Sequence, residues 1–220
     1  MSTKARHRFD ENCEDVERLL AIHKDIAGDA PGRKYGVEVL NKSAIVLICA
    51  FWEAYLEDLA DEALDAVTNG VADFTRLPMD LRKHLAKAVK TSPIDLSPWD
   101  LAGTGWQTFL RNNLAGLKQK YLEKWNTPKS YNIKVLYSLA LGMADVTASW
   151  KRPYLSNAIA IKRLDDFVTL RGAIAHRGKS RVSVTKWAAQ TFLSHVKELV
   201  TFTDEAVNNH VAGITGKPLF

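Results

Sequence analysis

Residues 37–68 read VEVLNKSAIVLICAFWEAYLEDLADEALDAVT. Apolar side chains recur in this stretch at steps of three, four and seven residues, which is the spacing of one face of an α-helix. Every residue from Ala44 to Trp52 is apolar, so the middle of this helix should be buried on all sides. The apolar face consists of Leu40, Ala44, Leu47, Ile48, Phe51, Tyr55, Leu59, Ala63 and Val67.

The second half of this predicted helix is acidic. We interpret the charge as a solvated face, because a run of charge on an amphipathic helix usually faces water. Glu53 is set apart from the others because it directly follows the most apolar stretch. The acidic residues are Glu53, Glu57, Asp58, Asp61, Glu62 and Asp65.

Further stretches on both sides carry the same helical period. The last of them begins near Ser183 or Thr185, either of which is a suitable N-cap. No stretch shows sustained period-two alternation between hairpin turns, which excludes a β fold. The predicted fold class is therefore all-α. The additional helices are expected at residues 9–27, 133–141, 157–177 and 183–211.

Residues 71–130 differ from the rest because prolines and the loop at 103–105 interrupt them. We interpret them as a helical, proline-punctuated insert and not as a second domain. The expected organisation is a single domain over residues 1–220, with core helices in about 9–70 and 131–211. The short helices of the insert are predicted at residues 78–90, 104–114 and 115–124.

The insert also combines aromatic with basic side chains. Such interleaving is typical of a surface that stacks bases and binds phosphates. The alternative, which we favour, is that the aromatic rings belong to the core and the basic residues only face water. The side chains concerned are Trp99, Trp106, Tyr121, Trp125, Arg82, Lys83, Lys87, Lys90, Arg111, Lys118, Lys120 and Lys124.

Composition narrows the class of protein. The chain has 220 residues, 46% of them hydrophobic, which is enough for one sizeable core. Its net charge of +5 permits a polyanionic partner without requiring one. The charged segment 1–15 does not resemble a secretory signal, and the apolar run Ala44–Trp52 is too short to span a bilayer. We expect a cytoplasmic protein that does not enter membranes.

Metal and cofactor motifs are missing from the sequence. Cys13 and Cys49 lie too far apart in the sequence to suggest a disulfide framework or a cysteine metal site. The six histidines lack ligand spacing, and phosphate-binding loops, H-E-x-x-H and G-x-S-x-G are absent. The sequence therefore predicts no metal and no cofactor.

The hexad Arg171-Gly172-Ala173-Ile174-Ala175-His176 lies at the end of the predicted helix 157–177. Histidine can transfer a proton at neutral pH, and arginine offers a permanent charge with a fork of donors that matches phosphate oxygens. These are the groups that metal-free RNA cleavage needs. The alternative is structural, with His176 complementing the helix dipole and Arg171 in a surface ion pair.

Helical geometry does not bring the two side chains of the hexad together. On an ideal helix, Arg171 and His176 differ by about 140° of rotation and roughly 7.5 Å of rise. They can meet one ligand if the last turn loosens, or if a partner chain completes the site. Gly178 is the expected left-handed stop of this helix.

The order of several short motifs resembles the HEPN superfamily, specifically its MAE_28990 / RiboL-PSP-HEPN group, over about residues 37–211. The stretch ICAFWEAYLEDL at residues 48–59 resembles the early long helix of that group. The later motifs are NTPKSYNI at 126–133, Leu141-Gly142, LDDFV at 164–168 and the hexad with the two residues after it.

This resemblance implies an all-α HEPN-type helical bundle, typically a homodimer, and a metal-independent endoribonuclease. The signature of the superfamily, Arg-x4-6-His, falls on Arg171 and His176. In active members two such pairs face each other across a dimer cleft and cleave RNA through a 2′,3′-cyclic phosphate. Many members act as toxins or in antiphage defence, so RNA and an antitoxin protein are the partners implied.

Each candidate site residue has an expected role. His176 would transfer the proton and Arg171 would hold the scissile phosphate. Arg177 is a candidate for a second phosphate contact, and Glu53 for orienting an active-site side chain. One departure is Gly172, because the superfamily often has Asn, Asp or His directly after the arginine. The alternative function is that of a non-catalytic HEPN module that binds RNA or a protein partner.

Overall fold

The computed structural model describes residues 2–28, 36–122, 125, 127–177 and 183–220, with the backbone alone at 27 and 177. Over these residues the one β pairing is a single bridge between Arg152 and Leu155, so the all-α prediction is confirmed. Short 3-10 helices are η1 (Phe74–Arg76), η2 (Ser97–Leu101) and η3 (Val146–Ser149). The α-helices are α1 (Lys4–Ala27), α2 (Glu38–Gly70), α3 (Met79–Lys90), α4 (Gly105–Asn112), α5 (Leu114–Tyr121), α6 (Ser130–Leu141), α7 (Asn157–Arg177) and α8 (Lys186–Thr215).

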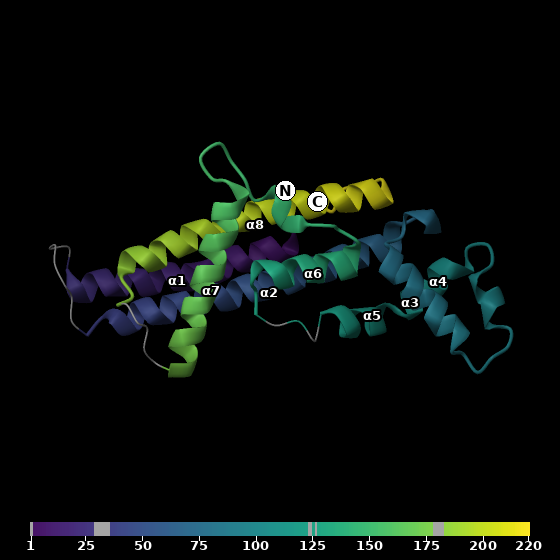
Figure 1. The fold of residues 1–220 in the computed structure, drawn as a ribbon, viewed down its shortest axis with the longest axis horizontal. Helices are drawn as coiled ribbons and strands as arrows, with labels where there is room; N and C mark the ends of the chain where they lie inside the picture. Colours follow the sequence, from purple (N-terminus) through teal and green to yellow (C-terminus); the bar gives the residue numbers. More distant parts are fainter. Residues whose placement is uncertain (1, 29–35, 123–124, 126, 178–182) are drawn as a thin grey trace.

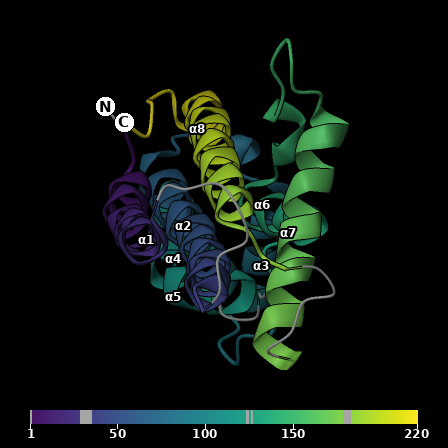
Figure 2. The ribbon, with the colours of Figure 1, turned by 90° about the vertical axis from the view of Figure 1, so that its left-hand side faces the viewer.

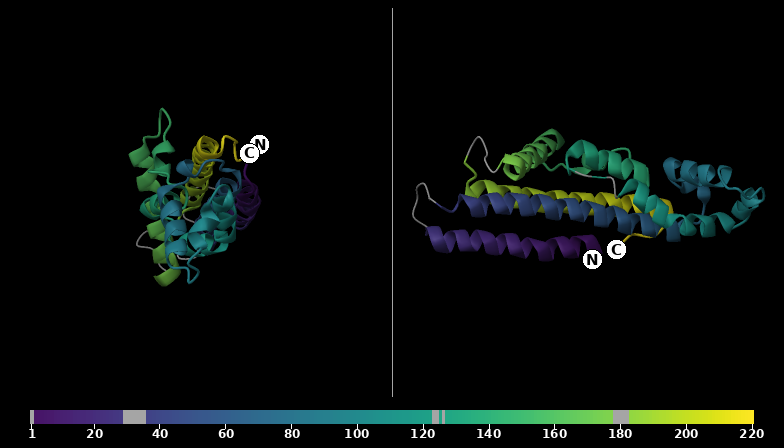
Figure 3. Two further views of the ribbon diagram at one scale, coloured as in Figure 1. Left: turned by 90° about the vertical axis from the view of Figure 1, so that its right-hand side faces the viewer. Right: turned by 90° about the horizontal axis from the view of Figure 1, so that it is seen from below.

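Helix α2 is the central element of the fold. Helices α1 and α8 run alongside it, as the two views in Figure 3 show. Helix α7 crosses this layer at a steep angle in Figure 1 and contacts α2, α6 and α8. Helices α3 and α4 lie beyond the C-terminal end of α2 (Figure 1). The arrangement leaves the last turns of α7 beside the N-terminal half of α2.

The core is built on the apolar stretch of α2. Trp52 is fully buried and stacks on Tyr55, with ring centroids 5.6 Å apart. The expectation of burial on every side is wrong, because Ala50 is exposed and Val46 and Leu47 are only half-buried. The neighbouring helices cover several sides of α2 but not all of them.

By length and composition, α2 is also apolar enough to cross a membrane. Its apolar residues here pack against α1, α6, α7 and α8. Burial in the helical core therefore accounts for this apolar character.

The acidic side of α2 is not simply solvated, which contradicts the sequence-based interpretation. The Glu62 carboxylate accepts hydrogen bonds from the backbone N–H groups of Lys4 and Ala5, at 3.1 and 3.3 Å. Asp58 forms an ion pair with Arg8 at 3.1 Å. Free N–H groups and the positive end of the dipole lie at a helix N-terminus, so these carboxylates dock the start of α1 on α2.

Two further acidic residues of α2 hold the insert. The ammonium group of Lys118 on α5 lies 2.8 Å from Asp61 and 2.9 Å from Asp65. Tyr121 on the same helix is buried, whereas Trp99 in η2 is 75% exposed. The interpretation that the aromatic rings belong to the core is therefore right for Tyr121 and wrong for Trp99. The interpretation that the basic residues only face water is wrong for Lys118.

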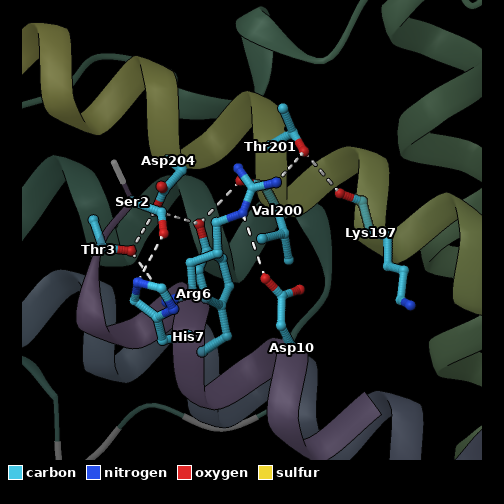
Figure 4. A network of polar contacts seen from close by, with 10 residues as sticks. Ser2, Thr3, Arg6, His7, Asp10, Lys197, Val200, Thr201 and Asp204 are labelled. Carbon is cyan, nitrogen blue, oxygen red and sulfur yellow. Dashed lines mark hydrogen bonds and ion pairs between the residues drawn. The ribbon is translucent and has the colours of Figure 1, made fainter. Parts of the chain in front are cut away.

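The start of α1 is fixed by a buried polar network, which Figure 4 shows from close by. The hydroxyl of Thr3 accepts from Arg6 N–H at 3.1 Å and donates to the Asp204 carboxylate at 2.6 Å. Tyr55 donates towards the same carboxylate oxygen and towards the Val200 carbonyl, and burial raises its pKa well above the ordinary value. This N-cap explains why α1 begins at Lys4, earlier than the periodicity predicts.

Candidate functional site

Helix α7 spans Asn157–Arg177, as the sequence predicts, and carries the hexad in its last two turns. Leu164 and Val168 are buried, and Phe167 stacks on Phe192 of α8 with centroids 4.3 Å apart. Figure 2 shows α7 standing beside the layer of α1, α2 and α8. The packing of its middle turns fixes the direction in which the hexad projects.

A polar contact ties α7 to the start of α6. The Asp165 carboxylate accepts two hydrogen bonds from Ser130, one from its N–H and one from its hydroxyl, both at 2.8 Å. Such a carboxylate at a helix N-terminus satisfies a free N–H group and complements the dipole. This contact anchors α7 from a second side.

Arg171 does not extend freely into solvent. Its Nη2 donates to Oε2 of Glu53 on α2 at 3.1 Å, and the two side chains are only 26% and 23% exposed. The other oxygen of Glu53 accepts from the backbone N–H of Thr127 at 3.2 Å. Both oxygens of this carboxylate are therefore engaged, and the guanidinium is held in one place.

The ion pair leaves part of the guanidinium available. An arginine has five N–H donors; the contact with Glu53 uses one of them, and a hydrogen bond to the thiol of Cys49 engages another. The remaining edge of the planar fork can donate to two phosphate oxygens at once. Glu53 cancels much of the charge of Arg171, so phosphate binding at this edge depends on directed hydrogen bonds more than on net charge.

A buried thiol lies against the same guanidinium. Burial raises the pKa of Cys49 to about 12, although nearby Arg171 lowers it somewhat. The thiol stays protonated at neutral pH, and thiols are nucleophilic only as thiolates. Cys49 is therefore a packing residue of this site.

His176 is exposed near the end of α7. Its side chain makes no hydrogen bond or ion pair to the parts of the chain that the structure describes. Helix α7 remains regular as far as Arg177, so the last turn does not loosen to bring His176 towards Arg171. Within one chain the two side chains lie about 140° apart around the helix, Arg171 towards α2 and His176 towards solvent.

A comparison with protein families shows which family this chain belongs to. A model of the RiboL-PSP-HEPN family matches residues 11–209. This chain belongs to the RiboL-PSP-HEPN family. No match was found among the curated proteins or among the solved structures. Membership confirms the resemblance to the HEPN superfamily and is consistent with either a ribonuclease or an RNA-binding module.

The matched range of the RiboL-PSP-HEPN family includes Glu53, Arg171 and His176, and the structure brings the first two together. The side chain of Arg177 and the position of Gly178 lie outside the described residues. No group of three or more metal-binding side chains occurs in the described part.

Two features of this RiboL-PSP-HEPN site were not predicted from the sequence. Thr127, which donates to Glu53, has a φ of 62°, an unusual value for a β-branched residue. The second is the contact of Arg171 with buried Cys49. The sequence around Thr127 and Cys49 gives no indication of these contacts, because each contact joins segments that are distant in the sequence.

Gly172, the departure from the usual HEPN pattern, has no packing role. A Cβ placed on this residue would meet no atom within 4 Å among the described residues. Its backbone is helical, so the position does not require the conformational freedom of glycine.

Proposed function

We propose that this chain is a metal-independent endoribonuclease of the HEPN type. The observation that carries the proposal is the half-buried Arg171, which Glu53 holds at 3.1 Å, together with an exposed His176 five residues later on the same helix. A fixed guanidinium can bind a phosphate without first losing the entropy of a free side chain. An exposed histidine can reach the ribose of a bound strand.

The proposed reaction is a transesterification. The ribose 2′-oxygen attacks the adjacent phosphorus, and the bond from phosphorus to the 5′-oxygen breaks. One histidine takes the proton from the 2′-hydroxyl, and a proton is returned to the leaving 5′-oxygen. The products are a 2′,3′-cyclic phosphate and a 5′-hydroxyl, while Arg171 stabilises the charge that develops on the phosphoryl oxygens.

The orientation of the hexad supports a site made by two chains. Arg171 faces α2 and His176 faces solvent, so one copy presents its proton-transfer group away from its phosphate clamp. A homodimer that places two hexads face to face would supply two histidines, one as base and one as acid. Light scattering at micromolar concentration should report a dimer, and a strict monomer would remove this composite-site model.

The alternative, a non-catalytic HEPN module, is favoured by one observation. The ion pair of Arg171 with Glu53 resembles a structural contact that fixes α7 on α2. In that case the RNA or protein partner would bind elsewhere on the bundle. The toxin or antiphage-defence role and the antitoxin partner implied by the family belong to the catalytic proposal.

The decisive experiment is single-turnover cleavage of RNA in excess EDTA. His176→Ala should slow cleavage about 10²- to 10⁴-fold, and Arg171→Ala about 10²- to 10³-fold. The matched controls are His7→Ala, an exposed histidine on α1, and Arg8→Ala, an arginine that also pairs with an α2 carboxylate. Both controls should cleave at the wild-type rate.

Two results would count against the proposal. Wild-type cleavage by His176→Ala would show that this histidine does not transfer the proton. Activity that EDTA removes and Mg²⁺ restores would replace the mechanism with a metal-dependent one. Circular dichroism of each variant separates loss of chemistry from loss of folding.

A further inference from the structure

A second candidate site lies between α7 and the first half of α8. It is a hollow of about 300 Å³ whose lining comes from one face of α8 and a single residue of α7. This volume is at the lower end of the range for small-molecule pockets, about 300–1,000 Å³. The lining residues are Arg163, Trp187, Gln190, Thr191, Ser194, His195 and Glu198.

His195 lines this hollow and carries a ring nitrogen without a hydrogen-bond partner among the described residues. Its side chain is 4% exposed, and its Nε2 lies 3.1 Å from the carbonyl oxygen of Ala160 on α7. A carbonyl can only accept, so Nε2 carries the hydrogen and Nδ1 of the neutral ring is an acceptor. This Nδ1 is buried and has no hydrogen-bond partner among the described residues. A buried acceptor without a donor is costly, so a small shift of the ring that brings Nδ1 to a donor in the hollow would remove this cost.

The charges around His195 keep its ring neutral. Burial lowers the pKa of His195 more than the hydrogen bond to Ala160 raises it. Arg163 lowers this pKa further, whereas Glu198 raises it. Glu198 forms an ion pair with Arg152 at 3.4 Å, so its charge is partly compensated. The neutral ring therefore remains an acceptor at pH 7.

An aromatic ring and a cation flank this acceptor. Trp187, in the first turn of α8, is 74% exposed although it lines the hollow. Exposed tryptophans offer a face on which any nucleobase can stack. Arg163 is exposed on α7 and is the cation of the lining, so it can meet a phosphate. One small hollow therefore combines a ring for stacking, Trp187, an acceptor for a base N–H, His195, and a cation for a phosphate, Arg163.

We propose that this hollow binds one unpaired nucleobase of the RNA substrate, stacked on Trp187, with a base N–H donated to His195 and the adjacent phosphate near Arg163. This inference rests on the proposed function, because it assigns a subsite to the same RNA. A base can reach the hollow and stack on Trp187 only when it is unstacked from its own strand, as in a single-stranded segment. The substrate is therefore single-stranded at this position.

The location relates the hollow to the hexad. Arg163 precedes Arg171 by eight residues on α7, which corresponds to about 12 Å of rise and about 80° of rotation. A few nucleotides span such a distance. A base held in the hollow would direct the strand towards the C-terminal half of α7, where Arg171 lies.

The first test measures binding of 5′-mononucleotides to the full chain, with AMP, GMP, CMP and UMP as probes and ribose 5-phosphate as the probe without a base. Trp187→Ala should weaken binding of the nucleotides roughly 5- to 150-fold. Trp99→Ala is the matched control, because Trp99 is 75% exposed and lies in η2 of the insert. It should leave affinity unchanged. Both residues are exposed, so neither change should unfold the protein.

Three outcomes overturn the inference. In the first, wild type and Trp187→Ala bind all four nucleotides with equal affinity. In the second, Trp187→Ala and Trp99→Ala weaken nucleotide binding equally. In the third, ribose 5-phosphate binds as tightly as the nucleotides. The last result would mean that the hollow recognises phosphate alone. Arg163→Ala should weaken nucleotides and ribose 5-phosphate alike, because both carry the phosphate.

Cleavage assays then separate this inference from the proposed function. If wild type cleaves single-stranded RNA and Trp187→Ala cleaves it equally well at subsaturating substrate, the subsite is refuted while the ribonuclease stands. If wild type does not cleave RNA but binds nucleotides through Trp187, the ribonuclease is refuted while the subsite stands.

Discussion

The ion pair between Arg171 and Glu53 should be energetically coupled, and a double-mutant cycle can measure the coupling. The cycle consists of Arg171→Ala, Glu53→Ala and the double variant. Glu53→Ala also removes the acceptor of Thr127 N–H, and Arg171→Ala also removes contacts with Cys49. Both side effects occur on parallel sides of the cycle, so they cancel in the coupling energy.

The expected magnitude follows from distance and burial. At 3.1 Å and an effective dielectric constant of 20, the attraction between unit charges is about 5 kcal/mol. Both side chains are about three-quarters buried, so desolvation and side-chain ordering offset most of this attraction. We expect a remaining coupling of about 1–2 kcal/mol, in the lower range for hydrogen bonds to charged groups.

The assay is urea unfolding followed by circular dichroism. The control cycle uses Arg8 and Asp58, a pair at the same distance of 3.1 Å whose side chains are 65% and 39% exposed. Such an exposed pair should couple by only about 0.2–1 kcal/mol. A coupling for Arg171 and Glu53 no larger than that of the control would refute the reasoning that burial strengthens this pair.

Two further predictions concern the surroundings of the site. Gly172→Ala should raise the free energy of unfolding in urea by about 0.5–1 kcal/mol, because alanine favours the helix and its Cβ finds open space here. A lower free energy of unfolding would show that the position needs glycine. Burial raises the pKa of the Cys13 and Cys49 thiols to about 12, so at pH 8 a thiol reagent should label them only as fast as the protein unfolds, and rapid labelling of the native chain would contradict this burial.

The sequence by itself determined the helices and the family. Apolar periodicity is a local property, so it placed α2, α7 and α8 to within a few residues. It did not predict that α1 begins at Lys4, because the capping residue Thr3 precedes the apolar period and its hydroxyl is fixed by Asp204, a residue 201 positions away. The hexad was equally visible, since it is a contiguous motif.

Only the tertiary structure decided what the polar residues do. Glu53 and Arg171 are 118 residues apart, and their contact exists because α7 crosses α2 at the level of its apolar stretch. The unused acceptor of His195 likewise depends on the packing of α8 against α7. Periodicity specifies which side of a helix is buried, whereas the angle and level at which two helices cross depend on all the side chains between them. The partners of charged groups follow from that crossing.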